Sequence, residues 1–150
     1  LDGLSIVNHI PGSSCVLDVG SGMGVPGIIL AIMLPTSKIT VLDSNSKKSA
    51  FLQQVKIELE LSNLSVVCKR VELYIPDELF TIITSRAFAD LALFVQLTEH
   101  LIADNGLYLA MKAERGLREM KEIDGFACRQ IELNVPYLDA KRFLIEMKRA

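Results

Sequence analysis

Short apolar runs alternate along the chain with longer segments in which apolar residues recur every three or four positions. Short apolar runs are typical of buried strands in a parallel sheet, whereas the longer spacing is typical of helices packed against one. The runs predict strands at Cys15–Val19, Lys38–Leu42, Ser65–Cys68, Phe80–Thr84 and Leu107–Met111. The longer segments predict helices at Leu1–Ile10, Ile28–Leu34, Ser46–Leu61, Asp90–Leu101 and Arg115–Ile123.

The last part of the chain has a different pattern, because apolar and polar residues alternate over Phe126–Val135 and again over Arg142–Met147. A period of two predicts a half-exposed hairpin that closes the edge of the sheet. The whole pattern predicts one α/β domain over residues 1–150: a Rossmann-like sheet, mostly parallel, with an antiparallel C-terminal strand. Residues 1–10 are expected to be the end of an N-terminal helical segment that begins upstream and is cut short here.

Two further sets of residues are expected in the core. The inner face of the helix predicted at Ser46–Leu61 consists of Phe51, Leu52, Val55 and Leu59. The cysteines, Cys15, Cys68 and Cys128, lie far apart and are odd in number, which fits neither a disulfide framework nor a zinc site. Each falls in a strand-like run, so we expect small core residues in a reducing, cytoplasmic setting, with no metal and no membrane span.

A glycine-rich turn joins the first predicted strand to the helix that follows. Gly20, Gly22 and Gly24 alternate with other residues, and Pro26 stands where a first helical residue would. Alternating glycines allow a tight bend and a close approach of the backbone to a ligand, and proline has a helix-like φ and no N–H to leave unpaired. A strand, a glycine turn and a helix N-terminus in this order predict a site for a nucleotide-like ligand.

The acidic residue ahead of the glycines, Asp18, distinguishes between two possible ligands, a dinucleotide and a sulfonium nucleoside. Gly22, Gly24 and Gly27 satisfy the spacing of dinucleotide binders, which leaves an NAD-dependent oxidoreductase as one alternative. The longer frame that begins at Asp18 fits the first motif of methyltransferases that use S-adenosylmethionine (AdoMet) better. A carboxylate is unfavourable beside a diphosphate, whereas AdoMet has no phosphate and carries an ammonium and a sulfonium. Asp18 is therefore predicted at the AdoMet site, together with Gly20 and Gly22.

Other candidate site residues follow the later strands. Asp43 ends the second strand, where an acid commonly binds ribose hydroxyls, although it could also cap the next helix. After the third strand, Val71 is expected to pack on an adenine base. Glu72 would accept a hydrogen bond from the adenine amino group, cap the next turn or remain a solvated acid. Arg86 follows the fourth strand and would hold the ligand or form a surface salt bridge. Phe88 would stack on a base or anchor the next helix.

Charge limits the choice of partner. The formal net charge is −2, so no overall basic field recruits nucleic acid, and any such binding must use a local patch. The weak candidates for contacts to a nucleic-acid backbone are Lys47, Lys48, Arg115 and Arg118, for each of which a solvated helix face is the simpler interpretation.

Several stretches together resemble one family: Asp18 to Gly27, Asp43 with Lys47 and Lys48, Arg70-Val71-Glu72, and Ser85 to Ala89. They are similar to the RsmG family, also called GidB, whose members are AdoMet-dependent methyltransferases of 16S ribosomal RNA. The resemblance implies methyl transfer to N7 of a guanine in the decoding region, with the small ribosomal subunit as partner. It also implies that Gly20, Val25, Val71, Glu72 and Arg86 surround AdoMet, and it offers Phe88 and Lys112 as weak substrate contacts.

This activity needs no catalytic base, because guanine N7 carries a free lone pair, and we nominate none. The residues by themselves also allow two further interpretations. One is a methyltransferase that acts on a small molecule or a protein, and the second is a non-enzymatic module with the AdoMet-binding fold.

Overall fold

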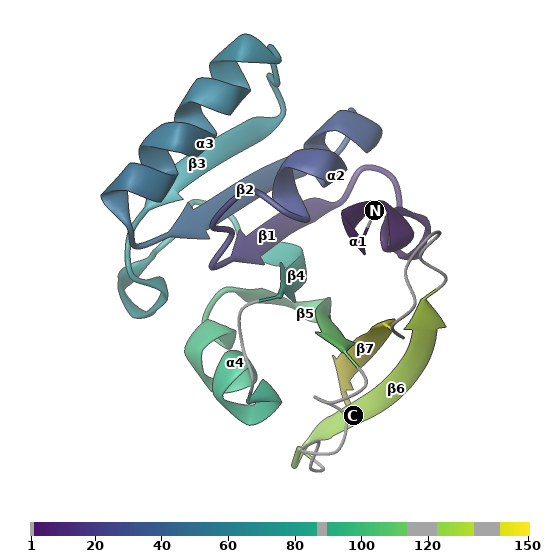
Figure 1. Cartoon of the computed structure of the whole chain (residues 1–150). Helices are drawn as coiled ribbons and strands as arrows, with labels where there is room; N and C mark the ends of the chain where they lie inside the picture. The colour runs from purple at the N-terminus through teal and green to yellow at the C-terminus, as the bar shows by residue number, and fades with distance from the viewer. Residues whose placement is uncertain (1, 87–89, 114–122, 134–141) are drawn as a thin grey trace.

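A computed structural model describes residues 2–86, 90–113, 123–133 and 142–150 of the chain. The strands form one seven-stranded sheet in the order β3-β2-β1-β4-β5-β7-β6 (Figure 1). Their bounds are β1 Cys15–Val19, β2 Lys38–Asp43, β3 Leu64–Cys68, β4 Phe80–Ser85, β5 Ile102–Ala113, β6 Phe126–Leu133 and β7 Arg142–Arg149. The helical elements are α1 Asp2–Ser5, η1 Val7–His9, α2 Gly27–Met33, α3 Ser46–Glu58, η2 Val71–Leu73 and α4 Leu91–Thr98.

The pairing of the strands confirms the predicted fold class. β1 to β5 run parallel to one another, and β7 pairs antiparallel with both β5 and β6. The two final strands pair antiparallel and close this edge of the sheet, as predicted, with β7 inserted between β5 and β6 and with β6 as the edge strand. Because β7 has a strand on each side and both of its faces are covered, Phe143, Leu144 and Ile145 are all buried. The half-exposed strand predicted there is therefore wrong for β7, whereas β6 is mostly exposed.

Helices cover both faces of the sheet, and each face has its own apolar core. Residues of β1 alternate between the two, so that Val16 packs with Leu30 of α2 and Leu52 of α3, while Leu17 packs with Phe94 of α4. Because side chains alternate between the two faces along each strand, the position of a residue in its strand decides whether its side chain lies on the face that α2 covers.

Most of the predicted bounds agree with the structure to within a few residues, but β5 begins at Ile102 and not at Leu107. The helix predicted at Arg115–Ile123 lies outside the described residues except for Ile123. The helix α3 ends at Glu58, and only Leu52 of its predicted inner face is fully buried, whereas Phe51 and Leu59 are about half exposed. The helix α3 covers β2 and the edge strand β3. At the edge of the sheet it packs against few side chains, so most of its apolar residues keep some exposure to water. The cysteine prediction fails in the same way, since Cys68 on β3 and Cys128 on β6 lie on edge strands and are exposed.

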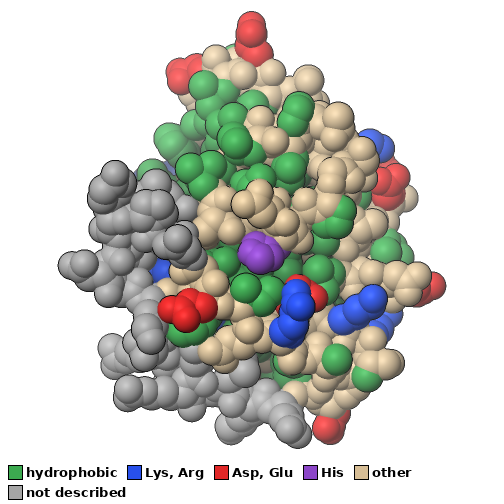
Figure 2. Space-filling view, turned by 90° about the vertical axis from the view of Figure 1, so that its right-hand side faces the viewer, with side chains coloured by type: hydrophobic (Ala, Val, Ile, Leu, Met, Phe, Trp, Pro, Cys, Tyr) green, Lys and Arg blue, Asp and Glu red, His purple; other side chains and the backbone are tan. Residues whose placement is uncertain are grey.

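The surface over α1 and α2 carries a gathering of hydrophobic side chains (Figure 2). Large apolar residues exposed on these two helices are Leu4, Ile32 and Met33. Among the described residues, no helix is long and apolar enough to cross a membrane, and no group of three His, Cys, Asp or Glu side chains is placed to hold a metal ion.

Candidate functional site

A cavity of about 280 Å³ opens at the carboxyl ends of β1, β2 and β3. Open α/β sheets bind ligands at this edge, beside the point where the strand order reverses, which here lies between β1 and β4. The lining residues come from the ends of the three strands and the segment after β3: Val19, Gly20, Leu42, Asp43, Ser44, Lys69, Arg70, Val71 and Glu72. Four of the residues predicted from the sequence are thereby brought together: Gly20, Asp43, Val71 and Glu72.

The glycine turn has the backbone conformation that its sequence predicts. Gly20, Gly22 and Gly24 have φ values of +68°, +54° and +89°, in the left-handed region that other residues rarely adopt. The N–H groups of Gly20 and Ser21 both donate to the carbonyl oxygen of Leu42, at 2.8 and 3.2 Å, so the turn is tied to the end of β2. The bend therefore has a fixed shape at the wall of the cavity.

Asp18 lies underneath this turn. Its side chain is 1% exposed, and its Oδ2 accepts hydrogen bonds from Ser21 Oγ at 2.7 Å and from the Gly27 N–H at 2.9 Å. Burial raises the pKa of the Asp18 carboxyl to about 7, against the lowering effects of these two hydrogen bonds and of the Arg86 charge. Asp18 is not among the residues that line the cavity. Instead the carboxyl joins the turn to the first residue of α2.

Gly27 is needed at this junction for space. A Cβ atom there would lie 2.8 Å from Asp18 Oδ2 and would also clash with a methyl group of Val41. The helix α2 starts at Gly27, so Pro26 is the residue before the helix and not its first residue. The Gly27 N–H is thus free of the helix and available to the Asp18 carboxyl.

Asp43 lies at the rim and faces the cavity. Its Oδ2 accepts from the Gly22 N–H and its Oδ1 from the Asn45 N–H, both at 2.9 Å. A carboxylate oxygen has two lone pairs, so each can accept one further hydrogen bond from a ligand hydroxyl. The capping role that the sequence left open belongs to Asn45, whose side chain accepts from the Lys48 N–H at the start of α3.

The segment after β3 forms the opposite wall. Val71 is nearly buried and presents an apolar surface, while Glu72 is paired with Arg70 at 3.1 Å between Oε2 and Nε. Both side chains of this ion pair are largely in water, where such pairs contribute little to stability. Lys69 and Arg70 also line the cavity, and the sequence analysis did not select them as ligand contacts. Their position directly after the third strand was the available signal.

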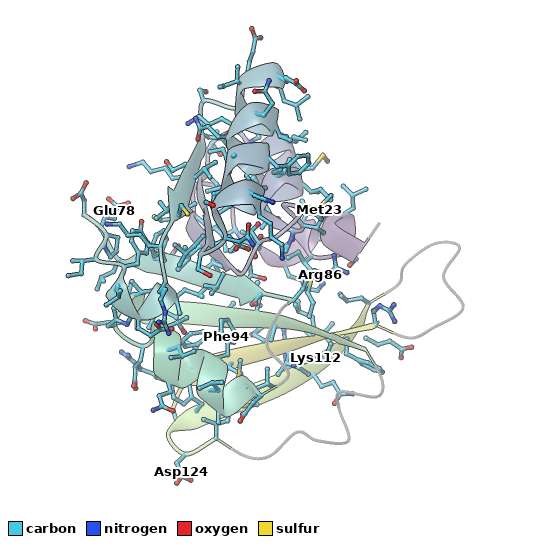
Figure 3. All side chains as sticks on the ribbon, turned by 60° about the vertical axis from the view of Figure 1, so that its left-hand side comes forward. Met23, Glu78, Arg86, Phe94, Lys112 and Asp124 are labelled. Atoms are coloured by element: carbon cyan, nitrogen blue, oxygen red, sulfur yellow. The ribbon has the colours of Figure 1, made fainter. Side chains whose placement is uncertain are left out.

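The other predicted residues lie around the cavity or outside the described part of the chain. Gly22, Val25 and Arg86 are not in the lining, although Gly22 is bonded to Asp43. Arg86 is exposed just after β4, and in the view of Figure 3 it lies between Met23 of the turn and Lys112 near the end of β5. Lys47 and Lys48 are exposed at the start of α3, and Phe88, Arg115 and Arg118 fall outside the described residues.

The sequence analysis also missed a buried serine that joins two strands at the site. Ser85 is 2% exposed, and its Oγ donates to the carbonyl oxygen of Val19 at 2.9 Å. This bond holds the carboxyl ends of β4 and β1 together, next to the glycine turn. Ser85 begins the stretch from Ser85 to Ala89 that carries part of the family resemblance, and this was the available signal.

The sheet order, the inserted antiparallel β7 and the glycine-walled cavity define the class of Rossmann-like methyltransferases. The solved structure of a SAM dependent methyltransferase from Aquifex aeolicus superposes with a TM-score of 0.77 at 15% identity, covering 98% of this chain and 89% of that one. At this identity the likeness concerns the fold alone.

The particular family follows from the sequence comparisons. The model of the GidB family, described as rRNA small subunit methyltransferase G, matches residues 1–145, and the chain belongs to this family. A relative named Ribosomal RNA small subunit methyltransferase G in Methylobacillus flagellatus is 46% identical over 145 residues, which are 97% of this chain and 70% of the relative. The protein of the same name in Chromobacterium violaceum is 49% identical over 149 residues, covering 98% of this chain and 71% of that protein. The predicted family is thereby confirmed.

Proposed function

We propose that this chain transfers a methyl group from AdoMet to N7 of a guanine in the decoding region of 16S ribosomal RNA, with the small ribosomal subunit as its partner. The observation that carries the proposal is the match of the GidB family over residues 1–145, because this range contains the whole described cavity. The choice of ribosomal RNA as substrate is supported by the names of the relatives, and the choice of AdoMet as methyl donor by the name of the Aquifex aeolicus neighbour.

The residues of the cavity fit the chemistry of AdoMet. Asp43 retains lone pairs for the ribose hydroxyls, and the apolar surface of Val71 and Leu42 can pack against the adenine base. Glu72 also lines the cavity and is proposed to accept a hydrogen bond from the adenine amino group. A volume of about 280 Å³ lies at the lower end of small-molecule sites, so the cavity encloses part of the donor and leaves the remainder along the open turn.

An NAD-dependent oxidoreductase is the less favourable interpretation of the same turn. Two carboxylates, Asp43 and Glu72, line the cavity, and a third, Asp18, lies beneath it. A pyrophosphate would meet like charges there, whereas the cationic AdoMet would not. Of the basic lining residues, Arg70 is already paired with Glu72.

Catalysis in this proposal depends on alignment. When bound, AdoMet supplies an electrophilic methyl group on a positively charged sulfur. Guanine N7 offers its lone pair without losing a proton, so no side chain has to act as a base, and neither His9 nor His100 lines the cavity. The turn, Asp43 and Glu72 hold the donor in one orientation, and such positioning can supply about 7–11 kcal/mol of the barrier reduction. Arg86 cannot take up a proton and is proposed to bind and orient.

Two measurements on the same preparation test the proposal. Calorimetric titration with AdoMet and, separately, NADH is followed by transfer of labelled methyl groups to small ribosomal subunits that lack the modification. We expect AdoMet to bind with a micromolar Kd, about −8 kcal/mol, and label to appear at a single guanine N7. AdoMet binding without label on the subunits would favour a different methyl acceptor. Binding of NADH alone would support the oxidoreductase, and binding of neither would leave a non-enzymatic module.

A further inference from the structure

Two buried oxygen atoms lie unpaired beneath the glycine turn. Asp18 is 1% exposed and Thr84 is 0% exposed. Asp18 Oδ1 and Thr84 Oγ1 have no hydrogen-bond partner among the described parts of the chain. Buried polar atoms in folded proteins nearly always have a partner, in the protein or in an ordered water molecule, so two unpaired atoms in one region need an explanation.

The register of the sheet places the two residues that carry these atoms side by side. In the parallel pair β1 and β4, Asp18 is directly opposite Thr84, two residues beyond the pair Val16 and Ile82. Val16 and Ile82 both belong to the core under α2, and the period of two puts Asp18 and Thr84 on that same face. Neighbouring strands are separated by about 4.8 Å, a gap that one water molecule can bridge with a hydrogen bond to each side.

We propose that Thr84 is a positioning residue for the methyl-donor site, because one internal water joins its hydroxyl to Oδ1 of Asp18 and fixes that carboxyl beneath the glycine turn. The proposal rests on the function proposed above. The other oxygen, Oδ2, holds Ser21 and Gly27, on the two sides of the turn. With Oδ1 tethered as well, the carboxyl cannot rotate, and the turn keeps the shape that the donor requires. Thr84 is not among the residues that line the cavity.

The surroundings of Asp18 decide in which direction its pKa should move when the Thr84 hydroxyl is removed. Burial raises the pKa of Asp18, the Arg86 charge lowers it and the Asp43 charge raises it. A hydrogen bond to an ionised carboxylate is stronger than one to its neutral form, so the bridge also lowers the pKa. Removal of the Thr84 hydroxyl should therefore raise the pKa of Asp18 and weaken the hold on the turn.

Three variants of the whole chain separate this role from general damage. Thr84→Val removes the hydroxyl at nearly constant volume, and Thr84→Ser keeps it. Thr98→Val is the matched control, because Thr98 is also 0% exposed but its Oγ1 donates to the carbonyl oxygen of Phe94 within α4, on the other face of the sheet. For each variant, calorimetry gives the Kd for AdoMet, NMR of the carboxyl carbon gives the titration of Asp18, and urea unfolding gives stability.

We expect Thr84→Val to raise the Kd for AdoMet about tenfold, the loss typical of one hydrogen bond to a charged group. It should also shift the titration of Asp18 upward by about half a pH unit or more. Thr84→Ser should remain within about twofold of the wild type in Kd and should restore the titration. Thr98→Val should lose stability without changing either quantity.

Other results overturn the proposal. If Asp18 titrates at the same pH in Thr84→Val as in the wild type, the Thr84 hydroxyl does not hold the Asp18 carboxyl. The same conclusion follows if Thr84→Ser changes the Kd and the titration as much as Thr84→Val does. An unchanged Kd together with a stability loss like that of Thr98→Val would make Thr84 an ordinary core residue. A wild-type chain that does not bind AdoMet would refute the proposed function, and the titration of Asp18, which needs no ligand, would still decide whether the link exists.

Discussion

Two carboxylates flank one glycine turn, and their surroundings give them different tasks. Asp18 at the end of β1 is 1% exposed and accepts from Ser21 and Gly27, below the turn. Asp43 at the end of β2 is half-buried, accepts from Gly22, and lines the cavity. Both accept a backbone N–H of the same loop, but only Asp43 has a surface left for a ligand. Depth in the fold therefore decides which acid supports the turn and which one is exposed to the cavity.

The largest expected effect comes from removing the buried acid. Asp18→Ala leaves the Ser21 hydroxyl and the Gly27 N–H buried without an acceptor, at a cost of about 1–3 kcal/mol each. We expect the free energy of unfolding in urea at neutral pH to fall by about 3 kcal/mol and AdoMet binding to disappear.

The matched control is Asp90→Ala. Asp90 also accepts two backbone N–H groups, of Ala92 and Leu93, but in water at the start of α4. Loss of such a cap should cost about 1 kcal/mol and leave AdoMet binding unchanged. Equal losses in the two variants would contradict the distinction between a buried and an exposed carboxyl.

The second prediction concerns pH. The pKa of Asp18 in the folded chain, raised by burial to about 7, lies above its value of about 4 in an unfolded chain. The folded state therefore binds the proton more tightly, and this contribution to stability is complete below about pH 4 and is lost as the pH rises through 7. Asp18→Asn keeps an oxygen acceptor and cannot titrate.

The free energy of unfolding of the wild type minus that of Asp18→Asn should accordingly decrease by about 2 kcal/mol between about pH 5 and about pH 6.5, since one pH unit corresponds to about 1.4 kcal/mol. Urea unfolding of both proteins at several pH values measures this difference. A difference that stays constant over that range would show that Asp18 remains ionised beneath the turn.

The third prediction concerns the acid at the rim. Asp43→Ala should weaken AdoMet binding by about tenfold to 150-fold, because hydrogen bonds to a charged acceptor contribute about 1.5–3 kcal/mol and each 1.4 kcal/mol is a factor of about ten. Stability should fall by only about 1 kcal/mol, since the Gly22 and Asn45 N–H groups it releases lie near water. Calorimetry and urea unfolding give the two numbers. Unchanged affinity would remove Asp43 from the ribose-binding role.

The smallest expected effect lies at the opposite wall. Glu72→Gln should raise the Kd for AdoMet about threefold, as one hydrogen bond to the adenine amino group weakens. Stability should not change measurably, because the ion pair with Arg70 is exposed. Arg70→Gln breaks the same ion pair and keeps Glu72 intact. If Arg70→Gln weakened binding as much as Glu72→Gln, then the ion pair or Arg70 itself, which also lines the cavity, and not the Glu72 carboxylate would be responsible.

Local patterns predicted most of the scaffold and part of the site. The glycine turn was predictable because positive φ values restrict the residues that can stand at Gly20, Gly22 and Gly24. The positions of Asp43 and Glu72 followed from the rule that parallel strands bring their carboxyl ends to one edge. The role of Thr84 was not predictable, since a threonine in an apolar strand gives no signal until its register with Asp18 is known.

By itself the sequence determined the order of strands and helices, the conformation of the turn and the family, because each of these depends on residues close together in the chain or on matched motifs. Only the tertiary structure decided that β7 inserts between β5 and β6, that two of the cysteines are exposed, and that Asp18 supports the turn from below. The physical reason is that burial depends on which distant segments pack against a residue, and periodicity along the chain does not encode that choice.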